Sequence, residues 1–578
     1  MKKSKKRNPR PAKAKRRAKA KPPARRKPRP EAAPEASGAG WSPFGAADPL
    51  AGARAALRAG DPHGAFGLCR EALGAAPHDA RALGLAGVAA YQAGLTDDAL
   101  GLLEAAVAFA PDDAEAQTNL GNVLAHLDRS GDAEAAYRAA VSADPGYAEA
   151  HYNLGALKEA AGDPAGARDA YARTLEINPD HALAHQGLGN MLKGLGQLDQ
   201  ARAAYEAALA RDPALPVAGT NLAALHHELG DFEAAEARCR RVLKDHPDFV
   251  EARYNLGIAL QERERHAAAR DAYEMVLAAV PGHAAAALNI AYGLQVEGRL
   301  DEAEAAFHRT LGIDPDFAMA HANLADLHLQ RGDAAAARTV CEAFLARHPG
   351  NTQMLASLAL ALGDAGDAAA RALVDFDRFV ATRTIAAPEG FDGHDDFNAR
   401  LAAHVEGHPT LAYAPRSHAT RQGRHSGELL GEPKGPFAAL ETVIRAAADA
   451  YAAGLGGADH PFVRARPERL GLSVWGVVMQ ASGHQIPHIH PAAWLSGVYY
   501  PKVPDIVGAA DAGRAGWIAF GRPPAHAHNR VEPEVRHVQP REGLLVLFPS
   551  YFYHHTEPFE TDETRISIAF DLIAARGG

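Results

Sequence analysis

Cysteine is scarce in this sequence, which has only three in 578 residues. Cys69, Cys239 and Cys341 lie 170 and 102 residues apart, which excludes the short spacings of a disulfide framework or of a cysteine-based zinc site. Both separations are multiples of 34, so the three thiols share one position of a repeat. We predict that each fills a buried position, because an unpaired cysteine packs as a small apolar side chain.

Long apolar runs are missing as well. No segment of about eighteen uninterrupted apolar residues is available to cross a bilayer, and the N-terminal region has no apolar stretch of the kind that a signal peptide needs. The sequence therefore predicts a cytoplasmic protein with no membrane span.

Acidic residues are absent from the first thirty positions, which contain 16 of the 61 Lys and Arg residues. The remaining 45 basic residues face all 70 acidic ones, so the body of the chain lacks a general basic field for nucleic acid. Residues 1–40 have few apolar side chains to bury, and we expect a disordered basic tail there. Two interpretations of the tail stay open: an anionic partner, such as nucleic acid, the ribosome or an anionic membrane, or a solvated segment without a partner.

What the chain has in abundance is a period of 34 residues. A proline recurs at this interval from Pro77 to Pro349, and an alanine does so from Ala65 to Ala337. Proline ends a helix because it has no backbone N–H to donate, and a small residue lets two helices pack closely. The pattern resembles the tetratricopeptide repeat, a helix-turn-helix unit. The resemblance implies an all-α superhelix of about nine repeats, closed by a capping helix, over residues 46–380.

Asparagine recurs on the same 34-residue grid, on the first helix of each predicted unit. First helices line the concave side of such a superhelix, and an amide that both donates and accepts can bind the backbone of an extended peptide. The row resembles the asparagine ladder of O-linked N-acetylglucosamine transferases, which implies a peptide or protein partner in the groove. The alternative is that each amide bonds to a neighbouring repeat. The residues concerned are Asn119, Asn153, Asn221, Asn255, Asn289 and Asn323.

The 34-residue period ends after the repeats, and a segment rich in turn-forming residues, APEGFDGHDD, marks a domain junction. We predict a helical linker or bracing region at 386–455, with helices around Phe397 and after Pro436. From 456 to 578 short apolar segments alternate with Gly, Pro and Asp, which is typical of a double-stranded β-helix, a jelly-roll or cupin-like fold. The protein is therefore predicted to be multidomain, a superhelix followed by a β domain with bracing helices. The expected strands are 470–479, 495–500, 517–520, 544–548 and 565–570.

Three histidines in the predicted β domain have the spacing of a metal site. His488 and His490 are two residues apart, so on a strand both imidazoles face the same side. His554 follows the apolar segment 544–548 and supplies a distant third ligand, with His555 as the neighbouring candidate. Imidazole is the commonest metal-ligating side chain, which favours this interpretation.

Around these histidines stand PHIHPAAWLSGVYY at 487–500, LFPSYFYHHTEPF at 547–559 and ETRISIAF at 563–570. These segments resemble the iron(II)- and 2-oxoglutarate-dependent oxygenases, and most of all the oxygenase domains found behind tetratricopeptide repeats. The resemblance implies Fe(II) at His488, His490 and His554. One departure is His490, which stands where most of the superfamily has a carboxylate, so the metal receives less charge compensation.

The same resemblance assigns a cosubstrate site. It implies that Arg565 binds the far carboxylate of 2-oxoglutarate and that Ser567, Tyr499 and Tyr500 reach the same molecule. The plainer alternatives are that Arg565 pairs with Glu563 or Asp562 on a strand surface and that the other three pack the barrel. The isolated His418 and His425 are interpreted as surface or core residues.

These features imply a 2-oxoglutarate- and Fe(II)-dependent dioxygenase, a hydroxylase whose repeats recruit a peptide or protein substrate. The alternative is a non-catalytic adaptor for protein–protein interaction with a degenerate barrel. A glycosyltransferase like the asparagine-ladder enzymes is a third class, but nothing after residue 380 resembles a nucleotide-sugar domain.

Overall fold

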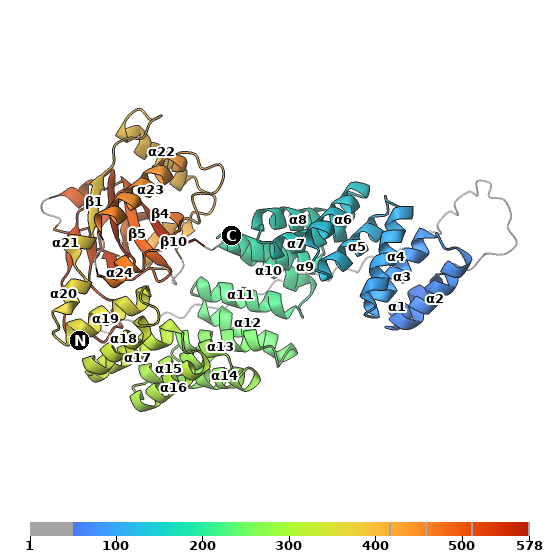
Figure 1. Ribbon diagram of the computed structural model, residues 1–578, viewed down its shortest axis with the longest axis horizontal. Helices are drawn as coiled ribbons and strands as arrows, with labels where there is room; N and C mark the ends of the chain where they lie inside the picture. Colours follow the sequence, from blue (N-terminus) through green and yellow to red (C-terminus); the bar gives the residue numbers. More distant parts are fainter. Residues whose placement is uncertain (1–49, 415–417, 457–458, 510–512, 576–578) are drawn as a thin grey trace, which may run out of the picture.

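The computed structural model describes residues 50–414, 418–456, 459–509 and 513–575. The basic tail predicted at 1–40 lies outside this part of the chain. Figure 1 shows an arc of helices that ends against a β domain. No helix within the described ranges combines the length and the apolar character needed to span a bilayer.

The helical array follows the 34-residue period. Its first helices have 13 residues and its second helices 14 through most of the array, as in α3 and α4. The bounds are α1 Ala51–Arg58, α2 Pro62–Ala75, α3 Ala80–Gln92, α4 Thr96–Phe109, α5 Ala114–His126, α6 Ser130–Ala143, α7 Ala148–Ala160, α8 Pro164–Ile177, α9 Ala182–Gly194, α10 Leu198–Arg211, α11 Pro216–Glu228, α12 Phe232–Asp245, α13 Val250–Glu262, α14 His266–Ala279, α15 Ala284–Val296, α16 Leu300–Ile313, α17 Ala318–Arg331, α18 Ala334–Leu345, α19 Thr352–Asp364, α20 Ala369–Leu373 and α21 Phe376–Phe379.

Packing between the two helices of a unit depends on a small residue facing a larger one sixteen positions later. A Cβ atom on Gly121, Gly155 or Gly257 would lie within 3.0 Å of the tyrosine ring that follows in its repeat. Where cysteine replaces the tyrosine, alanine replaces the glycine, as in Ala325 and Cys341. All three cysteines are free and fully buried, which confirms their prediction as core residues.

The turn between the two helices of a unit needs a left-handed residue. Glycine fills this position in most units, for example Gly94 at φ 79° and Gly230 at φ 81°. Asp128 at φ 58° and Glu264 at φ 59° fill it in two others, and a side chain there is strained because its Cβ approaches the following carbonyl oxygen.

Replacing Glu264 by Gly is therefore expected to stabilise the array by about 0.5–1 kcal/mol, since strain is relieved at a small cost in unfolded-state entropy. Urea unfolding followed by circular dichroism measures the effect. Gly230→Ala, at the equivalent turn, should destabilise by a similar amount, and equal midpoints for the two variants would contradict the prediction.

First helices of neighbouring units contact one another, as α5 contacts α7 and α11 contacts α13, so they line the inner side of the arc. The predicted asparagines all lie on these helices and are half-buried.

The β domain consists of two antiparallel sheets. The larger sheet has the order β1-β8-β5-β10-β4-β3-β2 and the smaller one β7-β6-β9. Its elements are β1 Ala381–Thr384, α22 His394–Glu406, β2 Ala412–Tyr413, β3 Thr420–His425, α23 Phe437–Gly454, α24 Pro461–Arg464, β4 Leu470–Gln485, β5 Ala493–Lys502, the 3-10 helix Asp505–Gly508, β6 Ile518–Phe520, β7 Arg536–Val538, β8 Leu544–Pro549, β9 His554–Thr556 and β10 Thr561–Ala574. This is the predicted double-stranded β-helix.

Helices brace the larger sheet, as Figure 1 shows for α22 and α23. Val405 of α22 packs so closely on β4 that a Cβ on Gly476 would lie 2.5 Å from its side chain. The strands predicted at 470–479 and 565–570 extend to Gln485 and to Ala574, because the added residues continue the pairing with β3 and with β4 respectively. The boundary predicted at 456 falls within the larger sheet, since β1, β2 and β3 come before it and the other four strands after it.

The end of the array and the β domain share one apolar core, which runs from Ala322 to Leu572. The segment between β6 and β7 also lies across the inner helices. The backbone N–H of His528 donates to Asp326 of α17 at 3.0 Å, and those of Arg530 and Val531 donate to Asp364 of α19 at 2.9 Å. The barrel therefore occupies the last part of the inner surface of the array.

Candidate metal centre

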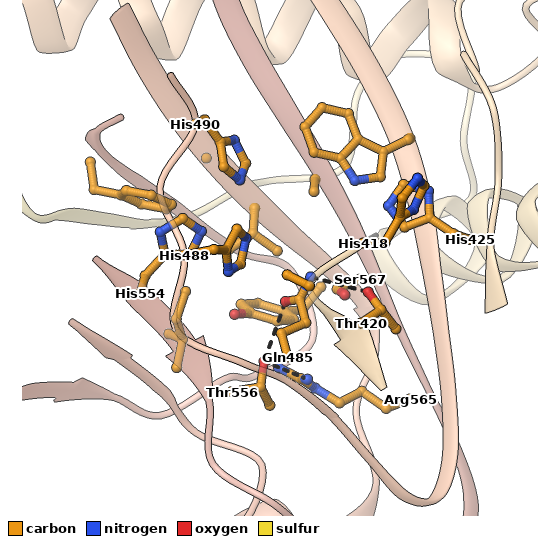
Figure 2. A pocket seen from close by; sticks show the side chains of 18 residues that line it. His418, Thr420, His425, Gln485, His488, His490, His554, Thr556, Arg565 and Ser567 are labelled. Carbon is orange, nitrogen blue, oxygen red and sulfur yellow. Dashed lines mark hydrogen bonds between the residues drawn. The ribbon is translucent and has the colours of Figure 1, made fainter. Parts of the chain in front are cut away.

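The three predicted histidines meet between the two sheets. His488 pairs with His554 through two backbone hydrogen bonds of 3.0 and 3.1 Å, and the N–H of His490 donates to the carbonyl of Ser550 at 3.0 Å. The ring centroids lie 4.2 to 5.2 Å apart, and one nitrogen from each ring lies within 4.8 Å of the others. Figure 2 shows the three rings on one side of the cavity.

One local prediction is wrong. His488 and His490 do not lie on a strand but in the irregular segment between β4 and β5, where His488 forms only an isolated bridge. Both rings still face one side because the segment is held in an extended path by bonds to the chain at Ser550 and His554.

Each of the three rings is held from behind through Nδ1. His488 Nδ1 lies 2.8 Å from the carbonyl of Ile486, His554 Nδ1 lies 3.0 Å from that of Phe552, and His490 Nδ1 lies 2.6 Å from the Asp571 carboxylate. A carbonyl or carboxylate oxygen accepts, so the proton sits on Nδ1 and the lone pair remains on Nε2. The set therefore offers three Nε2 atoms, the ligands that borderline metals such as Fe²⁺ and Zn²⁺ accept.

Burial keeps two of these imidazoles neutral. It lowers the pKa of His488 to about 4, with a smaller contribution from the neighbouring His490 ring. Burial likewise holds the pKa of His554 well below its ordinary value, and His488 adds to the effect. Neutral imidazole is the form that binds metal, so protons compete little with a metal ion for these two rings at neutral pH.

His555 points away from the other rings. Its Nε2 lies 3.2 Å from Glu557 and 3.4 Å from Arg522. Adjacent residues of β9 face opposite sides, which is why His554 and not His555 joins the cluster.

A cavity of about 210 Å³ extends from the three rings. Strands of both sheets form its wall, and Arg565 lies at the end away from His490 (Figure 2). The lining residues are His418, Ala419, Thr420, His425, Trp475, Gln485, His488, His490, Gly497, Val498, Tyr500, Ile518, Phe548, His554, Thr556, Arg565, Ser567 and Ala569.

Arg565 is buried without a carboxylate. Its side chain is 1% exposed, Nη1 donates to Thr556 Oγ1 at 3.4 Å, and the rings of Tyr500 and Phe559 flank it. Its Nε has no hydrogen-bond partner, and within the described ranges no acid lies in ion-pair range of it. Burial lowers the pKa of Arg565, opposed by the nearby Tyr500 hydroxyl. The alternative of a surface pair with Glu563 or Asp562 is therefore wrong.

Two of the other three predicted cosubstrate residues, Ser567 and Tyr500, line the cavity, and Tyr499 does not. Ser567 lines the cavity two residues from Arg565 on the same face of β10. Tyr499 does not: its hydroxyl donates to Asn398 of α22 at 2.6 Å, on the outer face of the sheet. Tyr500 faces the cavity, because neighbouring strand residues alternate between faces. The expectation for Tyr499 is wrong.

Several cavity residues were not predicted. His425 stacks on Trp475 with ring centroids 6.0 Å apart, and burial lowers its pKa to about 4. His418 lies 4.8 Å from His425, so both belong to the cavity wall and are not isolated residues. They enter because β3 pairs with β4, a contact between segments more than fifty residues apart that local sequence does not indicate. The sequence held one weak indication of Asp571, which lies an even number of residues after Arg565 and therefore on the same face of β10.

The asparagine row divides into different environments. Asn153 Nδ2 donates to Asn122 Oδ1 of the preceding repeat at 2.9 Å, and Asn221 makes the same bond to Asn190. Asn289 Nδ2 reaches Tyr254 at 3.4 Å. These three amides bond to a neighbouring repeat, as the alternative interpretation of the row predicts. Asn255 lines a hollow of about 310 Å³ on the inner helices α9, α11 and α13.

Fold and site thus define a helical repeat protein joined to a double-sheet β domain that carries a cluster of three histidines able to hold a metal ion. The tetratricopeptide repeat models match residues 56–123, 118–182, 152–216, 220–284 and 288–352. A model described as "Putative 2OG-Fe(II) oxygenase" matches residues 473–571. The chain is a tetratricopeptide repeat protein with a C-terminal domain of this oxygenase family.

Solved repeat structures resemble parts of the chain. MamA is 28% identical, with 28% of this chain covering 94% of MamA at a TM-score of 0.26. The APC/C hetero-tetramer Cut9-Hcn1 is 18% identical, covering 46% of this chain and 54% of that chain at a TM-score of 0.37. YrrB, titled a TPR protein with an unusual peptide-binding site, is 21% identical, with coverages of 32% and 95% and a TM-score of 0.28. The comparison with curated proteins gave no match.

Proposed function

We propose that the β domain is a working 2-oxoglutarate- and Fe(II)-dependent dioxygenase that hydroxylates a peptide or protein held by the repeats. The observation that carries the proposal is the pairing of a three-histidine cluster with a buried cation that has no anionic partner among the residues that the structure describes. A buried, unpaired guanidinium is costly, and an anionic ligand that enters the cavity removes that cost.

The residues present fit both groups. His488, His490 and His554 would hold the metal through Nε2, since each Nδ1 is engaged behind its ring. Arg565 has an Nε without a hydrogen-bond partner, and aromatic rings beside it exclude water. Its guanidinium would therefore bind a carboxylate by donating two parallel charge-assisted hydrogen bonds. Ser567 adds a hydroxyl on the same face. When bound, Fe(II) and 2-oxoglutarate together supply oxidation by dioxygen, in which the cosubstrate becomes succinate and carbon dioxide while one oxygen atom enters the substrate.

The repeats lie close to the cavity at a second point besides their C-terminal end. A Cβ on Gly196 would lie 3.9 Å from Thr410 of the β domain. The carboxylate of Glu228 lies near His418 and raises its pKa, against a larger lowering by burial. Glu228 also lines the hollow that contains Asn255. A segment bound at α9, α11 and α13 would thus lie beside the cavity wall, whereas the barrel itself covers the inner surface at α17 and α19.

The test is iron-dependent conversion of 2-oxoglutarate to succinate by the full chain, with anaerobic iron titration beside it. We expect stoichiometric iron binding that tightens with 2-oxoglutarate, and succinate formation even without substrate at a low rate. A protein that holds no iron under these conditions would be the adaptor instead.

Asn255→Ala should weaken peptide capture about five- to tenfold without lowering stability, because one amide contact is worth about 1 kcal/mol. The probe is a fluorescent peptide selected on the parent protein from a random library. Asn221→Ala is the matched control: its amide bonds to Asn190, so it should lose about 1 kcal/mol of stability instead. Unchanged capture by Asn255→Ala would make this hollow irrelevant to recruitment.

A further inference from the structure

Three imidazole ligands bring no negative charge to a divalent cation. An ion held by such a set gains from a carboxylate nearby even when that carboxylate is not a ligand. The cavity itself supplies none, since none of its lining residues is acidic. An acidic side chain lies directly behind one of the rings.

That acid is Asp571, on β10. Its Oδ1 lies 2.6 Å from His490 Nδ1 and accepts a second hydrogen bond, of 2.6 Å, from Ser496 Oγ. The hydroxyls of Ser496 and Ser550 lie 2.8 Å apart, and the carbonyl of Ser550 accepts the backbone N–H of His490 at 3.0 Å. Ring and backbone of His490 are therefore both tied to one network.

The network is held rigidly by the sheet. Asp571 faces Ser496 across the β10–β5 pairing, and both serines are fully buried. The side chains of His490 and Asp571 are only 14% and 17% exposed, so water competes little for their hydrogen bond. A charge-assisted bond of this length in such surroundings fixes the ring orientation.

We propose that Asp571 is the positioning residue of the metal centre. Through the His490 ring it supplies the negative charge that a directly bound carboxylate would otherwise bring to the metal. By accepting a hydrogen bond from the Nδ1–H of His490, Asp571 would keep the Nε2 lone pair of that ring free for the ion, and its negative charge would raise the donor strength of the ring. The inference rests on the proposed function, because it takes His490 as a metal ligand.

Asp571 and Arg565 place opposite charges on one strand, β10. Arg565, Ser567, Ala569 and Asp571 lie in one row on the same face, and the six-residue separation of the ends is about 20 Å along a strand. A single strand thus carries the cation at the cosubstrate end of the cavity and the anion behind the metal end. The opposite charges at its two ends match an anionic cosubstrate and a cationic metal.

The experiment compares anaerobic Co(II) and Fe(II) titrations of the parent protein with Asp571→Asn, Asp571→Ala and Asp571→Glu, each as the full chain. Affinity is read by calorimetry, and the geometry of bound Co(II) by its visible absorption. Asp562→Asn is the matched control, since Asp562 lies on the same strand but is exposed.

We expect Asp571→Asn to bind Co(II) 10- to 100-fold more weakly, since the amide keeps an acceptor but loses the charge. Asp571→Ala should be weaker still and show an altered cobalt spectrum, Asp571→Glu should recover part of the affinity, and Asp562→Asn should match the parent. The near-isosteric Asn variant keeps the test valid if the Ala variant fails to fold.

Parent-like affinity and spectrum in both Asp571→Asn and Asp571→Ala would overturn the inference and leave the oxygenase proposal standing. Failure of the parent protein to bind Co(II) or Fe(II) would instead overturn the proposed function itself, and the role of Asp571 with it. His490→Ala separates the two further: metal affinity equal to the parent's would remove His490 from the ligand set.

Discussion

Arg565→Ala is expected to keep its metal and to bind 2-oxoglutarate at least roughly 100-fold more weakly than the parent, because two charge-assisted hydrogen bonds of about 1.5–3 kcal/mol each are lost. Arg565→Lys keeps the charge without the planar fork and should retain part of the affinity. Calorimetric titration of the Co(II)-loaded protein and succinate formation measure the two effects.

A stability measurement sharpens this result. A buried cation without a carboxylate costs folding free energy, so Arg565→Met, which fills similar volume without charge, should melt no lower than the parent in the absence of ligand. If Arg565 instead stabilised the fold, Arg565→Met would melt at a lower temperature than the parent. If Arg565→Met melts lower and Arg565→Ala binds 2-oxoglutarate as the parent does, the oxygenase assignment loses its support from this end of the cavity.

His554→Ala and His488→Ala are expected to weaken Fe(II) binding by roughly 100-fold or more, since each removes one of three ligands where even an outer hydrogen-bond partner is worth 10- to 100-fold. His555→Ala is the matched control, because it deletes the same side chain one residue away. Its ring contacts Glu557 and Arg522 and should leave iron binding largely unchanged. Equal losses in His554→Ala and His555→Ala would mean that the effect is structural.

The two ends of the cavity can thus be tested separately. Variants at His488 and His554 should lose metal and, with it, 2-oxoglutarate-dependent turnover. Variants at Arg565 should lose the cosubstrate alone. The distinction matters because an adaptor with a degenerate barrel would show neither dependence.

Much of the candidate site was predictable because its signals are local. His488 and His490 share a side through a spacing of two, which holds in any extended segment, even outside a strand. Arg565 and Ser567 share a face of β10 for the same reason. Tyr499 shows the limit of the argument: a row of two tyrosines places one on each face, and only the pairing of β5 decided that Tyr500 is the one inside.

The repeats show the same limit. The 34-residue grid predicted which asparagines lie on inner helices, but not whether each amide is available. Asn153 and Asn221 bond to the preceding repeat because asparagines at 122 and 190 present acceptors to them. Ala224 holds the corresponding position before Asn255, so no such acceptor side chain is offered there, and Asn255 borders the hollow.

The sequence by itself determined the repeat period, the β domain after it and the candidate ligands, because each depends on spacings within a short stretch of chain. Tertiary structure alone decided that Asp571 lies behind His490, that His418 and His425 reach the cavity, and that residues 528–531 cover the inner face of the last repeats. These contacts join segments from about fifty to two hundred residues apart, and only the closing of the two sheets and the curve of the array bring them together.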